Sequence, residues 1–186
     1  MRVTKQRATE NRDRVVAAAA QLFRERGFDG VSVAELMASA GMTHGGFYNH
    51  FGAKEDVEAA ALAHVFEASL ARIQAVADEP DDDSRARAFE SYCASYVTPR
   101  ARDARGASCP MVAFAADVSR QGGAVRSAYS QGLAAYLKAF ATASQTERAE
   151  AIRRFAMLAG ALTLARSVAA SDPELSDEIL VAARSS

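Results

Sequence analysis

The chain has 186 residues, of which 49% are hydrophobic and 24% charged, and its formal net charge is −1. This balance is typical of a folded globular protein and excludes a disordered one. No window approaches the roughly 20 uncharged apolar residues of a membrane span, and the polar segment Met1–Arg14 has no signal-peptide pattern. We therefore expect a cytoplasmic protein with no membrane contact and two free thiols, Cys93 and Cys109.

The charge is unevenly distributed along the chain. Residues 1–54 contain eight basic and five acidic residues, and the remainder contains fourteen basic and eighteen acidic residues. A basic front on an acidic body is compatible with a nucleic acid held at one end, although a difference of this size is also an ordinary surface fluctuation.

The apolar residues recur at spacings of three and four, whereas runs with the two-residue period of a strand are nearly absent. The sequence therefore predicts an all-α fold of about nine helices. In chain order they cover about residues 10–26, 32–40, 44–50, 53–77, 85–97, 110–120, 124–143, 147–170 and 173–183. The segment 100–110 is too polar and too interrupted to assign.

Several helix ends carry recognisable signals. Thr9 is the expected N-cap of the first helix, and Gly27 its stop. Ser32 stands three residues before Glu35, the spacing of a capping box, and Gly41 ends the second helix. Three helices precede residue 52 and six follow it, so we expect a domain of residues 1–52 and a second of residues 53–186.

The second and third helices, joined by a turn at Gly41–Thr43, form a predicted helix-turn-helix, in which the later helix can enter the DNA major groove. At 100° per residue, and with Phe47 and Phe51 inward, the outward face carries His44, Gly45, Gly46, Tyr48 and Asn49. Two adjacent glycines weaken a helix, but on an outward face they let backbone amides approach phosphates or base edges.

The side chains around these glycines suit DNA. Asn49 can pair with adenine and His44 with guanine or phosphate, while the Tyr48 and Thr43 hydroxyls suit phosphate. Lys54 is expected to add a cation at the next helix start. Further cations are expected on a flexible N-terminal arm that follows the backbone or the minor groove, namely Arg2, Lys5 and Arg7.

Two other interpretations of this segment exist. The His-Gly-Gly sequence is a mere loop if Phe47, Tyr48 and Phe51 are core aromatics of a plain helical bundle. It also resembles the oxyanion loop of lipase-like hydrolases, but the G-x-S-x-G elbow and the strand-rich sheet of those enzymes are missing. We therefore predict no enzyme activity, no cofactor and no metal site.

The stretch VSVAELMASAGMTHGGFYNHFGAKEDV, residues 31–57, resembles the DNA-binding signature of TetR/AcrR-type transcriptional regulators, and AAAQLFRERGFDG, residues 18–30, resembles their first helix. Beyond this signature of about 50 residues, the chain matches the family only in length, helix count and helix order. The resemblance implies DNA contacts at the equivalents of most of the outward residues and also at His50. The position of Gly46 often carries a side chain in the family, so this protein is expected to rely more on DNA shape. The candidate DNA-binding residues are Ser32, Thr43, His44, Gly45, Gly46, Tyr48, Asn49, His50 and Lys54.

The resemblance also implies a small-molecule effector pocket in the second domain and a homodimer built from the last two helices. The candidate pocket residues, each of which could also be ordinary core, are Phe66, Tyr92, Tyr96, Cys109, Met111, Phe114, Tyr136, Phe140 and Met157. Small residues around Gly160 permit close helix approach, so the candidate interface residues are Phe155, Leu158, Gly160, Leu162 and Ile179. The alternative is a buried intramolecular helix.

Cys109 precedes Pro110, a residue favoured at the first position of a helix. A thiol at a helix N-terminus tends to have a lowered pKa, so Cys109 is a candidate redox or electrophile sensor with Cys93 as a possible partner; the alternative is an inert apolar residue.

These features together predict a dimeric regulator, most simply a repressor, that binds a near-palindromic double-stranded DNA operator. It would be released by a small molecule or by thiol modification. The alternative from another class is a helical ligand-binding or scaffold protein whose N-terminal module docks a protein.

Overall fold

The computed structural model describes residues 5–184, and the prediction of an all-α fold is confirmed over that range. Its nine α-helices and two short 3-10 helices are α1 (Lys5–Arg26), α2 (Val33–Ser39), η1 (His44–Asn49), α3 (Lys54–Ala77), α4 (Asp82–Tyr96), α5 (Pro99–Asp103), η2 (Arg105–Ala107), α6 (Pro110–Val118), α7 (Gly123–Ser144), α8 (Arg148–Val168) and α9 (Pro173–Arg184). None of these helices combines the length and hydropathy needed to cross a membrane.

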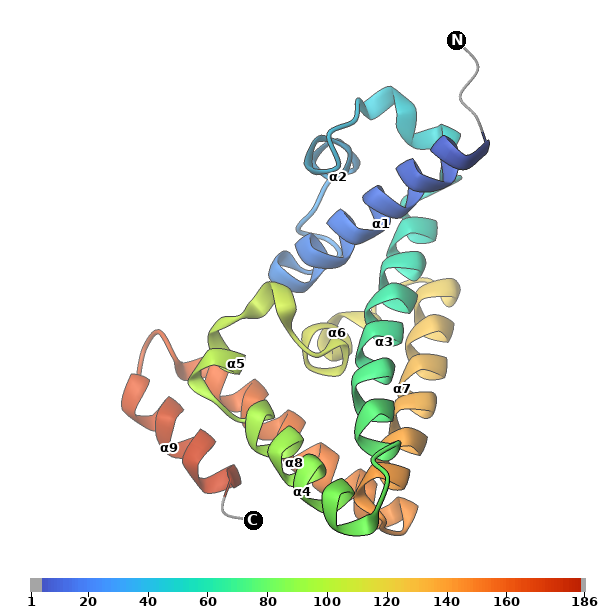
Figure 1. The fold of residues 1–186 in the computed structure, drawn as a ribbon. Helices are drawn as coiled ribbons and strands as arrows, with labels where there is room; N and C mark the ends of the chain where they lie inside the picture. Colours follow the sequence, from blue (N-terminus) through green and yellow to red (C-terminus); the bar gives the residue numbers. More distant parts are fainter. Residues whose placement is uncertain (1–4, 185–186) are drawn as a thin grey trace.

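The first three helices form one end of the molecule, with α2 and η1 lying beyond α1 (Figure 1). Their apolar faces enclose a small core, of which Val15, Phe23, Leu36 and Phe47 are almost fully buried. The Arg14 guanidinium adds a polar tie, because it donates a 2.6 Å hydrogen bond to the carbonyl of Ala40 at the end of α2. This core and tie fix the angle at which α2 and η1 are presented.

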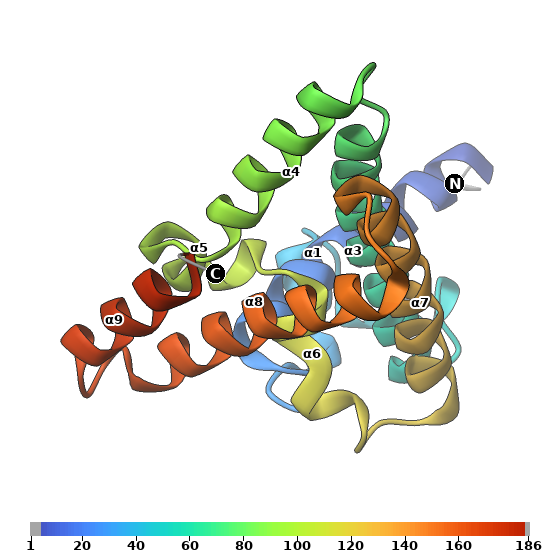
Figure 2. The same cartoon turned by 90° about the horizontal axis from the view of Figure 1, so that it is seen from below.

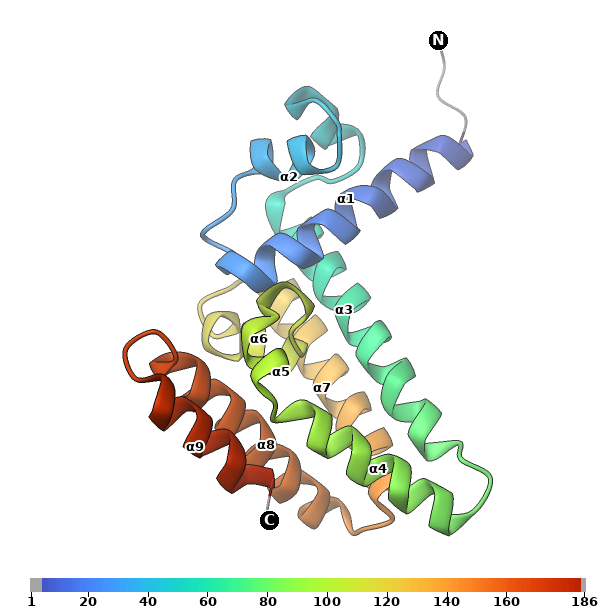
Figure 3. The ribbon, with the colours of Figure 1, turned by 60° about the vertical axis from the view of Figure 1, so that its left-hand side comes forward.

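Behind this end, α3 and α7 run side by side along the length of the molecule (Figures 1 and 3). The Glu55 carboxylate of α3 accepts from the backbone N–H of Ala124, which ties the start of α3 to the start of α7. At the other end of α7, the Gln145 amide donates to Asp82 at the start of α4. Helices α8 and α9 lie side by side at the far end, opposite α1 (Figure 2). The first turns of α3 belong to both regions, since Val57 and Ala61 are fully buried beneath α1.

Local signals explain most helix ends. The Ser32 capping box is formed as predicted, and Gly27 and Gly41, the stops expected after the first two helices, adopt φ of +74° and +71°. A left-handed backbone of this kind favours glycine because it has no Cβ. Asp81 caps α4, because its carboxylate accepts from the N–H of Ser84.

The structure differs from the predicted elements in three places. α1 begins at Lys5, so Thr9 is not its cap; the Thr9 hydroxyl instead donates to the Lys5 carbonyl one turn back. The third helix is 3-10 rather than α. The unassigned segment 100–110 contains α5 and η2, and α5 begins at Pro99 with Thr98 as its cap, a signal that the polar residues after it obscured.

Candidate functional site

The turn before η1 is fixed by backbone hydrogen bonds rather than by side chains. The Met42 N–H reaches back 2.8 Å to the Met37 carbonyl, and Gly41 supplies the left-handed residue between them. Thr43 then takes an extended conformation at the N-cap of η1, and its side chain makes no capping bond. Its hydroxyl is therefore exposed and is not committed to the helix start.

The two aromatic residues of η1 differ in burial, although their rings meet edge to face with centroids 5.3 Å apart. Phe47 is 1% exposed and packs on Phe51, with ring centroids 5.4 Å apart, whereas Tyr48 is 70% exposed. Apolar burial therefore holds η1 through Phe47, and the neighbouring Tyr48 ring remains available on the outer face.

Neither glycine of η1 is required by the fold of the protein alone. A Cβ built on Gly45 would meet nothing within 4 Å, and one built on Gly46 would lie 3.5 Å from the Met37 methyl, an ordinary contact. Among the described glycines only Gly27 and Gly41 have positive φ, so the backbone would accept a side chain at Gly45. The missing side chain at this position therefore matters only to something that approaches from outside.

The predicted contact residues gather around this surface. His44 and Asn49 are exposed and His50 is half-buried at the end of η1. A hollow of about 390 Å³ lies between η1 and the start of α1 and is lined by Ala8, Asn11, Met42, Thr43, Gly46, Asn49 and His50. We call the surface made by the exposed residues Thr43, His44, Gly45, Tyr48 and Asn49 the η1 face.

Ser32 lies at the start of α2 and is used by the capping box. Its hydroxyl accepts from the Glu35 N–H at 3.2 Å, while the Glu35 carboxylate accepts from both the Ser32 N–H and hydroxyl. Arg26 bridges the same carboxylate at 2.8 Å. These hydrogen bonds lower the pKa of Glu35 to about 2, and the bonds from Ser32 have the largest effect.

Three of the four predicted cations lie within the described residues, and none of these three is on η1 itself. The Lys54 ammonium turns inward, donating to the Phe28 carbonyl at 2.6 Å and lying 3.4 Å from the Glu58 carboxylate, so it ties α3 to the end of α1. Lys5 and Arg7 belong to helix α1, which contradicts the flexible arm, and Arg2 lies outside the described residues.

A cavity of about 340 Å³ lies in the second region, between α3, α4, α7, α8 and the α5–η2 segment. It is lined by Ser69, Arg72, Tyr92, Ser95, Tyr96, Ala101, Ala104, Ala107, Ser108, Cys109, Tyr136, Leu162 and Arg166. The structure thus brings together four predicted pocket residues, Tyr92, Tyr96, Cys109 and Tyr136. The Tyr92 and Tyr136 hydroxyls share a 2.8 Å hydrogen bond.

The other five predicted pocket residues do not line this cavity. Phe66 packs over Gly132 and against Tyr129, and Phe114 stacks on Phe28. Phe140 packs among other core aromatics. The Met111 side chain is buried with its sulfur 3.9 Å from the Cys109 thiol, and its carbonyl accepts from the Tyr129 hydroxyl. Met157 lies beside Arg154 at a separate surface hollow. Aromatic residues fill core and cavity walls equally well, so residue type alone does not separate them.

Sequence reasoning missed the polar part of the lining. Arg72, Ser95, Ser108 and Arg166 come from four separate segments, and nothing local marks any of them as facing a common space. The one available signal was Arg166, a charged residue within the otherwise apolar stretch 155–170 of α8.

The predicted dimer residues are mostly buried within their own chain. Phe155, Leu158 and Leu162 are at most 5% exposed, so they cannot form the outer surface of α8 as predicted. Gly160 faces open space and Ile179 is half-buried. The exposed apolar residues of this helix pair are instead Ile152, Leu164, Leu175 and Val181, which we call the α8–α9 face.

Cys109 occupies the expected N-cap of α6, with Pro110 at the first helical position. The prediction of a lowered thiol pKa was nevertheless wrong. Burial raises the pKa of Cys109, and this outweighs the opposing hydrogen bonds and the Arg72 charge. Burial also raises the pKa of Cys93, to about 11. No cluster of three or more metal-binding side chains exists within residues 5–184.

The N-terminal end of the chain is similar in sequence to a known protein family. Residues 15–61 match the family described as bacterial regulatory proteins, tetR family. This match runs from α1 through η1 into the first turns of α3, and it therefore includes the whole η1 face.

Two curated proteins are similar over parts of the chain. The HTH-type transcriptional repressor BepR of Brucella suis is 42% identical over 57 residues, which are 31% of this chain and 27% of that protein. The HTH-type transcriptional regulator TtgR of Pseudomonas putida is 35% identical over 83 residues, 44% of this chain and 40% of that protein. The matched part thus spans between about a quarter and two fifths of these relatives.

Solved structures are similar over nearly the whole chain. The reduced form of E. coli NemR has a TM-score of 0.78 at 22% identity and covers 95% of both chains. A TetR transcriptional regulator from Chloroflexus aurantiacus has a TM-score of 0.70 at 25% identity, covering 97% of this chain and 93% of that one. At these identities the likeness establishes the fold of the second region.

Proposed function

The chain belongs to the tetR family of bacterial regulatory proteins, and we propose on this premise that its η1 face binds a double-stranded DNA operator and that it acts as a transcriptional repressor. Regulation of this kind takes place in the cytoplasm and requires no catalytic group.

The observation that carries the proposal is the contrast within η1. Phe47 is buried and holds the helix, whereas Gly45 has open space where a Cβ would be and Tyr48 is exposed beside it. A glycine that the protein itself does not need is explained by close approach of a partner to the backbone. A helix-turn-helix inserts its second helix into the major groove, where phosphates and base edges come within hydrogen-bonding distance.

A homodimer would place two η1 faces on one DNA. We propose that the α8–α9 face joins two chains, because it leaves four large apolar side chains at 40–60% exposure on adjacent helices. A two-fold dimer requires a near-palindromic operator whose half-sites are separated by about one helical turn, roughly 34 Å. Residues 1–52 would then be the DNA-binding domain and residues 53–186 the effector-binding and dimerisation domain.

Release from DNA by a small molecule is supported by the position of the cavity. Its wall includes Ala104, the N-cap of η2, and Ala107, the last residue of η2. η2 packs on α1 so closely that a Cβ on Gly106 would lie 2.4 Å from a Glu25 carboxylate oxygen. A ligand that moves this wall would move α1, which carries the η1 face. Release by thiol modification receives less support, since both cysteines have raised pKa values.

The test is operator binding by a variant that adds a side chain to the η1 face. Gly45→Leu is expected to abolish binding to DNA from the protein's own promoter region, measured by fluorescence anisotropy, while leaving the fold intact. Gly123→Leu is the matched control, because a Cβ there also meets nothing within 4 Å but lies at the start of α7, away from the face. Undiminished binding by Gly45→Leu would overturn the proposal.

The scaffold alternative differs in its salt dependence. Phosphate contacts release counterions, so the logarithm of the DNA affinity should fall steeply with the logarithm of salt concentration. A module that docks a protein would show no such salt dependence of DNA affinity, and Tyr48→Ala would cause no loss of DNA binding.

A further inference from the structure

The cavity between α3, α4, α7, α8 and the α5–η2 segment carries positive charge without a matching acid. Arg72 and Arg166 line it, and no Asp or Glu is among its lining residues. The remainder of the lining is aromatic, aliphatic or hydroxyl-bearing. Its volume of about 340 Å³ falls within the range of small-molecule sites.

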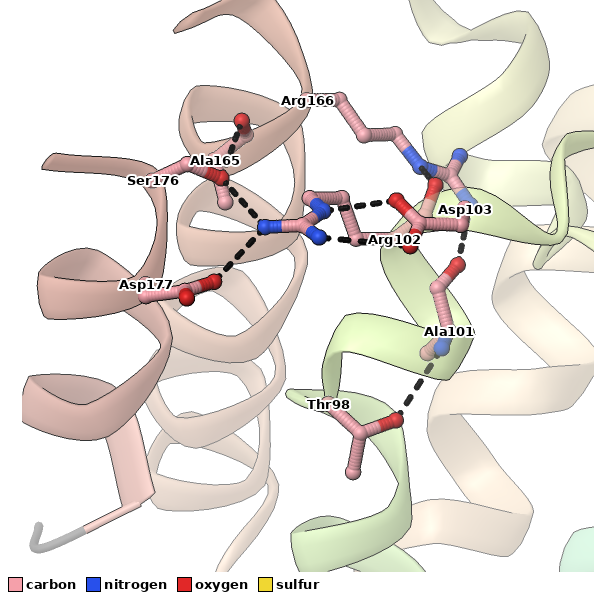
Figure 4. Close-up of polar contacts among 8 residues, drawn as sticks. All are labelled: Thr98, Ala101, Arg102, Asp103, Ala165, Arg166, Ser176 and Asp177. Atoms are coloured by element: carbon pink, nitrogen blue, oxygen red, sulfur yellow. Dashed lines mark hydrogen bonds and ion pairs between the residues drawn. The ribbon is translucent and has the colours of Figure 1, made fainter. Parts of the chain in front are cut away.

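Arg166 is half-buried and makes no ion pair with a described carboxylate. Its guanidinium donates to the carbonyls of Ala101 and Arg102 and to the Ser108 hydroxyl, at 2.7, 3.0 and 2.5 Å, and all three acceptors are neutral. The two nearby acids are used elsewhere, because Asp103 and Asp177 both pair with Arg102 (Figure 4). Asp103 attracts the Arg166 charge without bonding to it, since that charge contributes to lowering the pKa of Asp103. The charge of Arg166 is therefore only partly balanced beside the cavity.

Arg72 lines the cavity from α3. Within the described residues its guanidinium donates one hydrogen bond, to the Ser69 hydroxyl at 3.2 Å, which leaves most of its five N–H donors available. Its positive charge also acts on the other lining residues, because it lowers the pKa of both Tyr92 and Cys109 against the larger effect of burial.

Tyr96 provides a second, independent indication of a ligand. It lines the same cavity, only 9% of it is exposed, and its buried hydroxyl has no oxygen or nitrogen partner among the described residues. It interacts instead with the Cys109 thiol, whose sulfur is a weak acceptor. A buried hydroxyl ordinarily has a stronger partner, because leaving one unpaired costs about 1–3 kcal/mol. The neighbouring Tyr92 and Tyr136 hydroxyls satisfy each other, so Tyr96 is the tyrosine that is left able to bind a ligand acceptor.

We propose that this cavity binds a small aromatic carboxylate, with its carboxylate between the Arg72 guanidinium and the Tyr96 hydroxyl and its ring among the other tyrosines. The planar guanidinium fork matches a carboxylate in a bidentate pair, and Arg166 adds positive charge to the same cavity wall. The identification of this molecule as the effector rests on the proposed function.

The same contacts connect the occupant to the DNA-binding end. Arg166 holds the carbonyls of α5 and the Ser108 hydroxyl, and Arg102 holds α5 to α9 through Asp177 and the Ser176 hydroxyl (Figure 4). The α5–η2 segment is thus clamped to α8 and α9 on one side and packs on α1 on the other. An anion beside Arg166 weakens this clamp by competing for the guanidinium.

Isothermal titration of the full chain without DNA tests the binding site. Benzoate and cinnamate are compared with benzamide and cinnamamide, which keep the ring and lose the charge. We expect at least one carboxylate to bind roughly tenfold or more tightly than its amide. Arg72→Gln should remove that advantage, whereas Arg126→Gln, an exposed arginine at the start of α7, should keep it.

The results separate cleanly. Equal binding of acid and amide, loss of the advantage in Arg126→Gln, or no binding of either acid at millimolar concentration would overturn the proposal. Tyr96→Phe should weaken the same carboxylate in a chain whose urea unfolding is unchanged. Fluorescence anisotropy with operator DNA is a separate measurement. If the bound acid releases the protein from DNA, its role as effector is supported. If the protein binds no DNA at all, the proposed function is contradicted, while the titration still decides whether the cavity binds the carboxylate.

Discussion

The ring of Phe28 stacks on the ring of Phe114, with their centroids 5.0 Å apart and their planes 18° apart. Phe28 follows α1 at the DNA-binding end, and Phe114 lies in α6, the helix that begins beside the cavity at Cys109. Both rings are fully buried, so this contact joins the two regions through their cores.

Replacing one of these rings should therefore loosen the junction. Phe114→Ala removes a buried aromatic side chain and should reduce the free energy of unfolding by about 3–5 kcal/mol, measured by urea denaturation. Tyr48→Ala, which removes a ring that is 70% exposed, should change stability by less than about 0.5 kcal/mol. Similar losses in the two variants would contradict the assigned burial of Phe114.

The Ser32–Glu35 capping box should give the DNA-binding end a pH dependence. The folded pKa of Glu35 is about 2, below its usual value of 4.5. An acid with a lowered folded pKa stabilises the protein above its unfolded pKa, and this contribution is lost as pH falls from 4.5 through 2. NMR titration of the Glu35 carboxyl measures the pKa directly.

Ser32→Ala serves as the test of cause. Without the hydroxyl, the pKa of Glu35 should move upward toward 4.5, and loss of the cap should cost about 1 kcal/mol of stability. Ser91→Ala on the exposed side of α4 is the control. A Glu35 pKa that stays near 2 in Ser32→Ala would show that the backbone N–H of residue 32 and Arg26 keep it low without the hydroxyl.

Both thiols should react slowly at neutral pH. The thiolate is the reactive form, and the pKa of Cys93 is raised to about 11 while burial also raises that of Cys109. We expect iodoacetamide to alkylate the folded chain much more slowly than the urea-unfolded chain, with the rate increasing above pH 9. Mass spectrometry of each cysteine peptide measures this, and fast labelling of Cys109 at pH 7 would restore the sensor hypothesis.

The α8–α9 face should determine the oligomeric state. Leu164 and Val181 are about 60% exposed on these adjacent helices, so Leu164→Glu and Val181→Glu should convert a dimer to a monomer with little effect on the fold of one chain. Sedimentation velocity with circular dichroism measures both effects. Ala63→Glu, at an exposed position of α3, should leave the dimer intact; a dimer that survives both α8–α9 substitutions would place the interface elsewhere.

The sequence by itself determined the helices and the η1 face. Helix periodicity, the Ser32–Glu35 box and the glycines at 27 and 41 are local, because each depends on residues within one or two turns of the chain. The outward position of Gly45 and Tyr48 also followed from local phase, even though η1 is a 3-10 helix, since the burial of Phe47 fixes which side faces in.

Only the tertiary structure decided which residues share the cavity, where Lys54 points and which side of α8 faces out. Arg72 and Arg166 are 94 positions apart, and their common space exists because α3 and α8 pack around α5 and η2. Lys54 turns inward because its ammonium donates a hydrogen bond to the Phe28 carbonyl, just after the end of α1. The inward side of α8 carries Phe155, Leu158 and Leu162, and the Phe155 ring packs against Tyr96 of α4 and Phe140 of α7. A helix with apolar residues on several sides does not reveal from its sequence which side will be buried.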